Sequence, residues 1–339
     1  MTSPPSAAGS GGSGALRASS VVTLAGGPVP RRGRALNGPQ VVSDGVVGWR
    51  DGRIVYAGPA SGWDGPVDER FEARTIVPGF VDCHTHLPFV GWRAEEFEAR
   101  LAGATYRELH AEGGIYRSAR LMAEASDEEV LAFCRPLVAE MLDHGTTAFE
   151  TKTGYGLSVE RELRQARLAV ALAAESPQTV VHTLLACHAV PRGMERQAWV
   201  DAVCAALVPR VAAEGLAGAV DVYVEDIAFS VGDLEVVAAA ADHHGLALRC
   251  HADQLGPSGA AEAAVRFGAL SADHLNHLSG AGIEALGAAP TAAVLLPSSS
   301  AFLGAPPPPA RRLVGAGAAV AVATDFNPGT SPALSMPEA

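Results

Sequence analysis

One repeated pattern limits the possible folds of this chain more than any other feature. Between Pro78 and Asp325, short apolar runs rich in β-branched residues alternate with longer, amphipathic, alanine-rich stretches. Such alternation is typical of repeated β-α units. The repeat extends over about 250 residues, the usual size of a (β/α)8 barrel. We therefore predict an α/β fold with a TIM-like barrel, whose eight strands lie at residues 79–86, 146–152, 179–188, 219–226, 246–253, 270–274, 291–299 and 318–325.

The segments on either side of the barrel differ from it in composition. Residues 18–77 contain short valine-rich runs and an Asp51-Gly52 pair that is typical of a hairpin turn, so they predict a small β domain. Residues 1–17 are rich in Ser, Gly and Pro and predict a disordered tail. The barrel is assigned to residues 78–331. The last residues, 332–339, are interpreted as a truncated C-terminal end, because they leave little room for a final barrel helix.

Charge and cysteine content exclude several classes of function. The formal net charge is −12, which argues against binding to nucleic acid or to an anionic membrane. The five cysteines have no C-x-x-C spacing and suit free thiols in a reducing compartment. No apolar run approaches the roughly 20 residues that span a bilayer. We therefore expect a cytoplasmic enzyme with a small-molecule substrate.

Polar side chains fall at the ends of the predicted strands. In a (β/α)8 barrel, the carboxyl ends of the strands form the catalytic face. The polar residues at these ends are His84, His86, Lys152, His188, Glu225, His251, His274 and Asp325. Their shared position predicts one site at the barrel mouth.

The pair His84-x-His86 places two imidazoles on the same side of a strand, as two ligands of one metal ion require. Such a pair is a weak signal alone. His251, His274 and Asp325 end three further strands and make chance convergence improbable. A ligand set of three imidazoles and one carboxylate, drawn from these residues, suits zinc or iron, and the sequence does not choose between the two metals.

Lys152 raises the question of a two-metal site bridged by a carbamylated lysine. Such a lysine ends the fourth strand in enzymes that use it, whereas Lys152 ends the second and Glu225 ends the fourth. A mononuclear site is therefore the better interpretation. The metal would lower the pKa of a bound water, Asp325 and His274 would accept or guide its proton, and His188 would donate to the resulting oxyanion.

Six motifs follow one another between Pro78 and Ser331: PGFVDCHTHLPFVGWRAEEFEARLAGATY, TKTGYGL, CHAVP, CHADQL, SADHL and ATDFNPGTS. Together they resemble those of the imidazolonepropionases. These amidohydrolases open the ring of 4-imidazolone-5-propanoate to give N-formimidoyl-L-glutamate in histidine degradation. GWRAEEFEARLAG and TDFNPG separate this family from other amidohydrolases.

The resemblance implies roles for individual residues. It assigns metal ligation to His84, His86, His251 and Asp325. It assigns substrate contacts to Arg93, Tyr155, His188 and Gln254, with Asn327, Gly329 and Thr330 holding the amino-acid part of the product. Arg93 would offer a bidentate fork to the propionate, which an acidic protein would otherwise repel. The resemblance also implies a homodimer.

The chain departs from the family at two places. Many relatives have a glutamate where this chain has Gln254. Glutamine binds substrate but cannot shuttle a proton, so catalytic proton transfer would fall more on Asp325 and His274. Relatives also continue beyond the position of Ala339 with a last barrel helix and strands of the small domain. The resemblance therefore implies a small β-sandwich whose C-terminal part is missing.

Two other functions fit parts of the sequence. Another mononuclear amidohydrolase, such as a cytosine or guanine deaminase, would share the barrel and the metal residues. Arg93 and the Asn327-Pro328-Gly329 turn argue against it, because a neutral nucleobase needs no anion anchor. The second alternative is a truncated, non-catalytic barrel, which metal content and thermal unfolding would distinguish from an enzyme.

Overall fold

The computed structural model describes residues 12–27, 29–69, 73–105, 108–109 and 113–339. The chain divides into two compact units, Met1–Gly79 and Phe80–Ala339. This boundary lies close to the predicted end of the small β domain at residue 77. Among the described residues, no helix combines the length and apolarity needed to cross a membrane.

The first unit is built on one four-stranded sheet, ordered β3-β2-β1-β4. β1 pairs antiparallel with β2 and parallel with β4, and β2 pairs antiparallel with β3 through the predicted Asp51-Gly52 turn, in which both residues have positive φ. The strands are β1 (Gly14–Val22), β2 (Val41–Arg50), β3 (Arg53–Pro59) and β4 (Ala73–Ile76). Among residues 12–27, 29–69 and 73–79, there is no second layer of the kind a sandwich requires.

The first strand begins earlier than the sequence indicates. β1 starts at Gly14, inside the segment 1–17 predicted as a disordered tail, and Ala15 and Ala18 on this strand are buried. Its eight register pairs with β2 satisfy a backbone that composition alone marked as unstructured. Residues 1–11 of that prediction lie outside the described residues.

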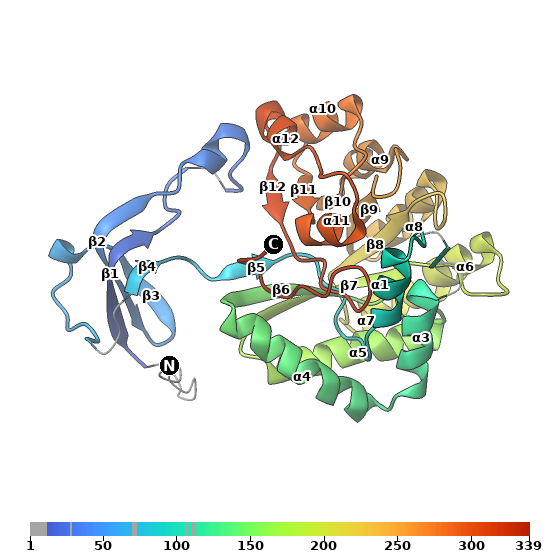
Figure 1. Ribbon diagram of the computed structural model, residues 1–339, viewed down its shortest axis with the longest axis horizontal. Coiled ribbons are helices and arrows are strands. Elements are labelled where there is room, and N and C mark those ends of the chain that lie inside the picture. Colours follow the sequence, from blue (N-terminus) through green and yellow to red (C-terminus); the bar gives the residue numbers. More distant parts are fainter. Residues whose placement is uncertain (1–11, 28, 70–72, 106–107, 110–112) are drawn as a thin grey trace. The chain divides into compact units, whose positions relative to one another are not determined.

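The second unit contains the predicted eight-stranded parallel sheet, in the sequential order β12 to β5 (Figure 1). The strands are β5 (Phe80–Asp82), β6 (Thr146–Lys152), β7 (Thr179–Cys187), β8 (Ala219–Val224), β9 (Ala247–Ala252), β10 (Ser271–His274), β11 (Ala292–Leu295) and β12 (Val320–Val322). Each lies within a predicted run. The (β/α)8 barrel predicted from the sequence is confirmed.

The first and last strands are joined just beyond their ends. The amide of Asp325 donates to the carbonyl of His84, and the amide of His86 donates to the carbonyl of Phe326, at 3.0 and 2.9 Å. Below them, the buried Asp82 carboxylate accepts from the Thr324 amide and hydroxyl. Burial raises the pKa of Asp82 to about 7. These bonds place residues from β5 beside residues from β12 at the mouth.

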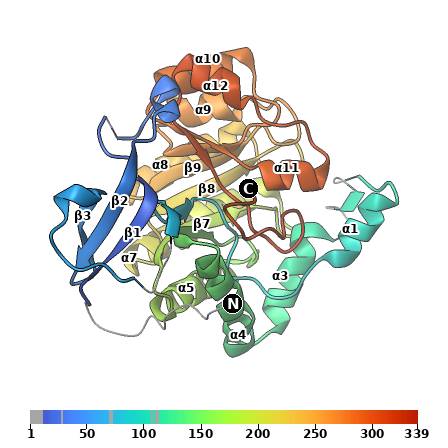
Figure 2. The same ribbon diagram turned by 60° about the vertical axis from the view of Figure 1, so that its left-hand side comes forward.

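Helices follow every strand from β5 to β11. They are α1 (Ala94–Leu101), α3 (Gly114–Glu124), α4 (Asp127–Asp143), α5 (Val159–Glu175), α6 (Arg196–Ala202), α7 (Val208–Ala213), α8 (Val231–His243), α9 (Ala260–Arg266), α10 (Gly280–Ala288), α11 (Pro297–Leu303) and α12 (Ala310–Ala316). In both ribbon views, α9, α10 and α12 lie side by side along one flank of the barrel (Figures 1 and 2). Leu163, Val237 and Ala261 belong to the buried core of helix and strand side chains.

One predicted strand ends differently. The run 291–299 is extended only to Leu295, and α11 begins at Pro297. Proline is favoured in the first turn of a helix, where its missing N–H costs nothing. The two serines that follow therefore belong to a helix and not to a strand.

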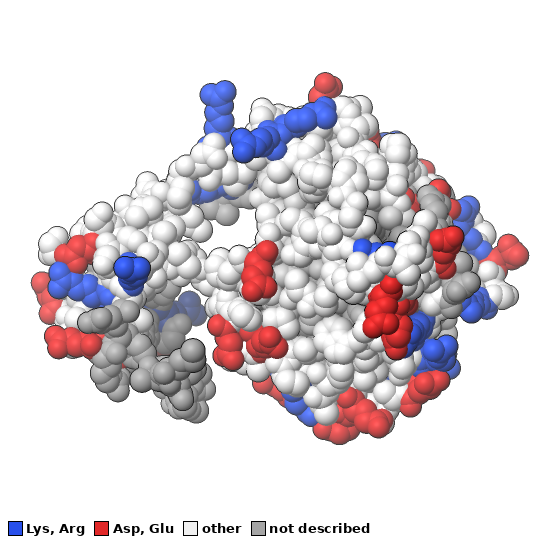
Figure 3. Space-filling view, viewed as in Figure 1, with Lys and Arg blue, Asp and Glu red and all other residues white. Residues whose placement is uncertain are grey.

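Charged side chains of both signs are interspersed over the face of the molecule seen in Figure 3. Ion pairs at the surface of the molecule include Arg135 with Glu128 and Glu175, and Arg167 with Glu214.

Candidate active site

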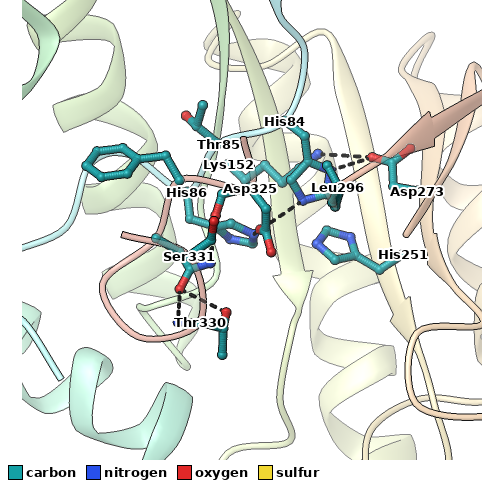
Figure 4. Close-up of polar contacts among 12 residues, drawn as sticks. His84, Thr85, His86, Lys152, His251, Asp273, Leu296, Asp325, Thr330 and Ser331 are labelled. Carbon is teal, nitrogen blue, oxygen red and sulfur yellow. Dashed lines mark hydrogen bonds and ion pairs between the residues drawn. The ribbon is translucent and has the colours of Figure 1, made fainter. Parts of the chain in front are cut away.

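The metal-compatible side chains predicted from the sequence meet at the carboxyl end of the barrel. All five are at most 3% exposed. Asp325 Oδ1 lies 3.1 Å from His86 Nε2 and 3.5 Å from His84 Nε2. Figure 4 shows His84, His86 and His251 converging near the Asp325 carboxylate. Two sets have ligand atoms within 4.8 Å of one another: His84, His251 and His274, and His84, His86 and Asp325.

Three imidazole nitrogens of this cluster are buried without a hydrogen-bond partner among the described residues: Nδ1 of His86, Nε2 of His84 and Nε2 of His251. In His84 and His251 the opposite nitrogen is engaged, since His84 Nδ1 lies 2.6 Å from Asp273 Oδ2 and His251 Nδ1 lies 3.0 Å from Asp221 Oδ1. An ionised carboxylate only accepts, so Nδ1 carries the hydrogen and Nε2 keeps its lone pair. An unpaired buried acceptor costs about 1–3 kcal/mol. The residues therefore fit a divalent metal ion, which would take these lone pairs.

Burial also sets the charge of these imidazoles. It lowers the pKa of His84 well below its ordinary value and lowers that of His274 to about 3. Neutral imidazole is the form that binds metals. The site therefore holds His84 and His274 in the neutral state.

The backbone at the site is strained. Asp325 and His274 have φ values of 56° and 76°, in the left-handed region that residues other than glycine seldom adopt. Each such residue costs of order 1–3 kcal/mol unless its surroundings hold it. The barrel-closing bonds at Asp325 supply that restraint on one side of the site.

Beneath the histidines lies a charged layer, of which only Lys152 is predicted at the site from the sequence. Lys152 Nζ lies 2.7 Å from Glu150 Oε1 and 2.8 Å from Asp221 Oδ2. Burial would lower the pKa of Lys152, but Asp221, Glu150 and Asp273 outweigh it and raise the pKa. Lys152 is thus a charged ammonium held by carboxylates, which argues further against a carbamylated bridging ligand. Asp221 could have been noticed as an acidic residue inside an apolar strand.

A cavity opens above the histidine cluster. Sequence analysis had singled out every lining residue except Ile115 and Tyr223. The cavity is lined by His86, Arg93, Ile115, Tyr155, His188, Tyr223, His251, Gln254, His274, Asp325, Asn327 and Thr330. The predicted substrate residues and the metal-compatible residues therefore share one pocket. Two predicted residues are not part of the lining: His84, whose Nε2 lies 3.5 Å from Asp325 Oδ1, and Gly329, which lies against Arg93.

Arg93 places a buried cation in this cavity. Its side chain is 4% exposed, with Nε 3.3 Å from Glu96 Oε2 and Nη1 3.3 Å from Ser118 Oγ. Glu96 also accepts a 2.8 Å bond from the amide of Gly114 at the start of α3. Because the Glu96 carboxylate is shared with the Gly114 amide, several N–H donors of the Arg93 guanidinium remain available for an anionic ligand.

The Tyr155 loop is fixed from α5. The Glu162 carboxylate accepts from the amides of Gly154, Gly156 and Leu157, and the Gln165 side chain accepts from the amide of Tyr155. Sequence analysis predicted a loop that approaches a ligand closely, and it missed the two side chains that hold it. Both lie on the inner side of the first turns of α5.

His188 stacks on His86, with ring centroids 5.1 Å apart. Its Nδ1 lies 3.2 Å from the carbonyl oxygen of Gly154, so Nδ1 must donate. Burial lowers the pKa of His188 well below its ordinary value, so the ring is neutral and Nε2 is an acceptor. This differs from the sequence analysis, which expected His188 to donate to an oxyanion.

The Asn327 loop differs from expectation in a similar way. Asn327 Oδ1 accepts from the amides of Gly329 and Thr330 and from the Thr330 hydroxyl, and its amide group donates to the Asp325 carbonyl. These donors were expected to face a carboxylate, but here they close the turn. The Arg93 amide donates to the Pro328 carbonyl at 2.9 Å, which fastens the loop to Arg93.

Gln254 is positioned by the end of the fourth barrel strand. The Glu225 carboxylate accepts from the amides of Gln254 and Leu255, at 2.6 and 2.9 Å. Burial raises the pKa of Glu225 to about 7. Glu225 therefore fixes the loop that carries Gln254 and does not face the metal-compatible cluster.

The chain matches a model of the amidohydrolase family over residues 75–336. It is 48% identical over 301 residues to an imidazolonepropionase of Xanthomonas campestris pv. campestris strain 8004, a match that covers 87% of this chain and 75% of the relative. It is 46% identical over 301 residues to an imidazolonepropionase of Stenotrophomonas maltophilia strain R551-3, covering 87% of this chain and 74% of the relative.

Solved structures show the same fold. An adenosine deaminase from Xanthomonas campestris with bound zinc has a TM-score of 0.64 at 18% identity, covering 95% of this chain and 71% of that protein. A guanine deaminase from C. acetobutylicum with bound guanine has a TM-score of 0.67 at 12% identity, covering 96% and 77%. At such identities the likeness concerns the fold alone. The curated relatives and the family match go further: the chain belongs to the amidohydrolase family and, within it, to the imidazolonepropionases.

Proposed function

We propose that this protein hydrolyses 4-imidazolone-5-propanoate to N-formimidoyl-L-glutamate. The name of its relatives supports the activity. The observation that carries the proposal is that the buried Arg93 guanidinium lines the same cavity as the histidine and aspartate cluster. A substrate that carries a carboxylate beside a hydrolysable ring needs both features in one pocket.

One zinc or iron ion per chain would be held by His84, His86, His251 and Asp325. When bound, it supplies Lewis acidity, which makes water a nucleophile at neutral pH and polarises a carbonyl. Asp325 faces His84 and His86 and would take the proton from the attacking water. His274 stands beside His84 and His251 and would guide that proton onward.

The substrate would lie between Arg93 and the histidine cluster. Arg93 would bind the propionate through its guanidinium fork. Tyr155 would contact the ring, and His188 Nε2 would accept a hydrogen bond from a ring N–H, as its tautomer requires. Gln254 would bind without moving a proton. Asn327, Gly329 and Thr330 would shape the end of the pocket that receives the amino-acid part of the product.

Turnover can be measured directly. Purified, metal-analysed protein is mixed with freshly made 4-imidazolone-5-propanoate, and loss of the imidazolone ultraviolet absorbance is compared with spontaneous decay. We expect fast loss with formation of formimidoylglutamate. Absence of loss with folded, metal-loaded protein would overturn the proposed substrate, and the same protein could then be tested on nucleobases.

Removal of the metal is expected to abolish turnover and to lower the midpoint of thermal unfolding. At a metal concentration a hundred times its Kd, binding to the folded state contributes about 2.7 kcal/mol. Chelator treatment, metal analysis and calorimetry check this, and restored metal should recover both properties. Unchanged turnover in protein shown to be metal-free contradicts the metal assignment.

Gly329→Ala is expected to raise KM strongly and to lower the free energy of unfolding only slightly. A Cβ at this position would overlap the Arg93 guanidinium, which is the far end of a flexible side chain and can move aside. The displaced guanidinium would lose its aim at the propionate, so we expect KM to rise about tenfold, which corresponds to about 1.4 kcal/mol. Steady-state kinetics and thermal unfolding measure the two effects. A wild-type KM would show that Arg93 does not need this glycine.

A further inference from the structure

Lys152 is the only lysine of the chain; every other member of its 25 lysine and arginine residues is an arginine. It ends β6 and is fully buried inside the barrel. Removing an ammonium group from water costs several kcal/mol, even after relaxation of the protein around it. A lysine persists at such a position only where fixed acceptors surround it.

The acceptors around Lys152 are the carboxylates that hold two of the histidines. Asp221 divides its oxygens, with Oδ2 2.8 Å from Lys152 Nζ and Oδ1 3.0 Å from His251 Nδ1. Asp273 Oδ2 lies 4.0 Å from Lys152 Nζ and 2.6 Å from His84 Nδ1. One ammonium therefore faces both aspartates, and each aspartate orients one imidazole. Figure 4 shows Lys152, His84 and Asp273 in this arrangement.

We propose that Lys152 is a positioning residue of the metal centre, which fixes Asp221 and Asp273 and thereby aims Nε2 of His251 and Nε2 of His84 at one point. The inference rests on the metal site of the proposed function. Lys152 contacts neither substrate nor metal in this role. A compact ammonium with three donors suits three surrounding carboxylates, whereas the flat fork of arginine does not.

A competing explanation is plain charge balance. Glu150, Asp221 and Asp273 are three buried acids, and Arg249 supplies a second cation 3.8 Å from Glu150. If charge balance alone mattered, loss of either cation would have the same consequence. Arg249 Nη1 donates a 3.3 Å hydrogen bond to Ser271 Oγ, and Arg249 forms no hydrogen bond with Asp221 or Asp273. It is therefore the matched control.

The test compares Lys152→Met and Arg249→Met as purified apoproteins. Zinc affinity is measured by competition with a chromophoric chelator, and folding by circular dichroism and calorimetry of the apo form. We expect Lys152→Met to weaken zinc binding by about 10–100-fold, as loss of such supporting contacts does. Arg249→Met should keep the wild-type affinity. Wild-type affinity in folded Lys152→Met, or an equal loss in Arg249→Met, overturns the inference.

A second measurement needs no variant. Because the chain has one lysine, growth on isotope-labelled lysine gives one side-chain nuclear magnetic resonance signal, that of Lys152. Zinc added to the apoprotein should shift this signal at one equivalent, and no change would contradict the inference. If wild-type protein binds no zinc, the proposed metal site and this inference both fail. If wild type binds zinc and Lys152→Met binds it equally well, only the inference fails.

Discussion

His86→Ala is expected to eliminate turnover and metal retention together. His86 contributes one of the nitrogens that converge near Asp325, and its loss removes both a ligand and the 3.1 Å contact that orients this carboxylate. Water without a metal keeps a pKa near about 15.7, whereas metal binding brings it to about 7, so we expect kcat/KM to fall by more than about a thousandfold. Metal analysis and the absorbance assay measure the two effects.

His144→Ala is the matched control for this variant. His144 follows α4 directly and is 41% exposed in its side chain, whose one ion pair with a described residue is that with Glu140 at 4.0 Å. We expect its turnover and metal content to equal those of the wild type. Calorimetry of both apoproteins checks that each variant is folded. A metal-loaded, active His86→Ala protein would show that the ion binds elsewhere.

The fold could be predicted because its signals are local. Each barrel strand lies in an apolar run, a helix follows every strand from β5 to β11, and Gly145, Gly215, Gly245 and Gly268 have the positive φ typical of helix C-termini. Where another local signal competes, the prediction errs, as at Pro297, whose preference for a helix start ends a run that otherwise extends to residue 299. The beginning of β1 needed its pairing with β2, which composition does not reveal.

The site could be predicted only in part, because its second layer depends on distance in space. His84 and His86 carry a recognisable spacing, and His251, His274 and Asp325 are recognised by their place at strand ends. Asp273 and Asp221 belong to different strands from the histidines that they orient, so no spacing connects them. The tautomer of His188 depends on the Gly154 carbonyl, a contact between two strand ends. Such contacts between distant parts of the chain become visible only in the folded structure.

In the proposed function Arg93 binds the propionate, so its replacement should weaken substrate binding and leave metal binding unchanged. Arg93→Gln removes the charge but keeps a donor at a similar distance. A hydrogen bond to a charged group contributes about 1.5–3 kcal/mol, so loss of a bidentate pair predicts a fall in kcat/KM of about 100- to 1000-fold. Most of this loss should appear in KM. The metal content should not change, because Arg93 lies apart from the convergent nitrogens.

Arg117→Gln is the matched control for Arg93→Gln. It breaks the partly exposed ion pair between Arg117 and Glu95 on the neighbouring helix and should leave kcat and KM unchanged. A 4-imidazolone that lacks the carboxylate sharpens the test. In the wild type, kcat/KM for this analogue should be lower than for the full substrate by about the factor by which Arg93→Gln lowers kcat/KM for the full substrate. The Arg93→Gln variant should have similar kcat/KM values for the two compounds. If the variant still prefers the carboxylate-bearing substrate as strongly as the wild type does, the propionate binds elsewhere, even though the metal centre is correctly assigned.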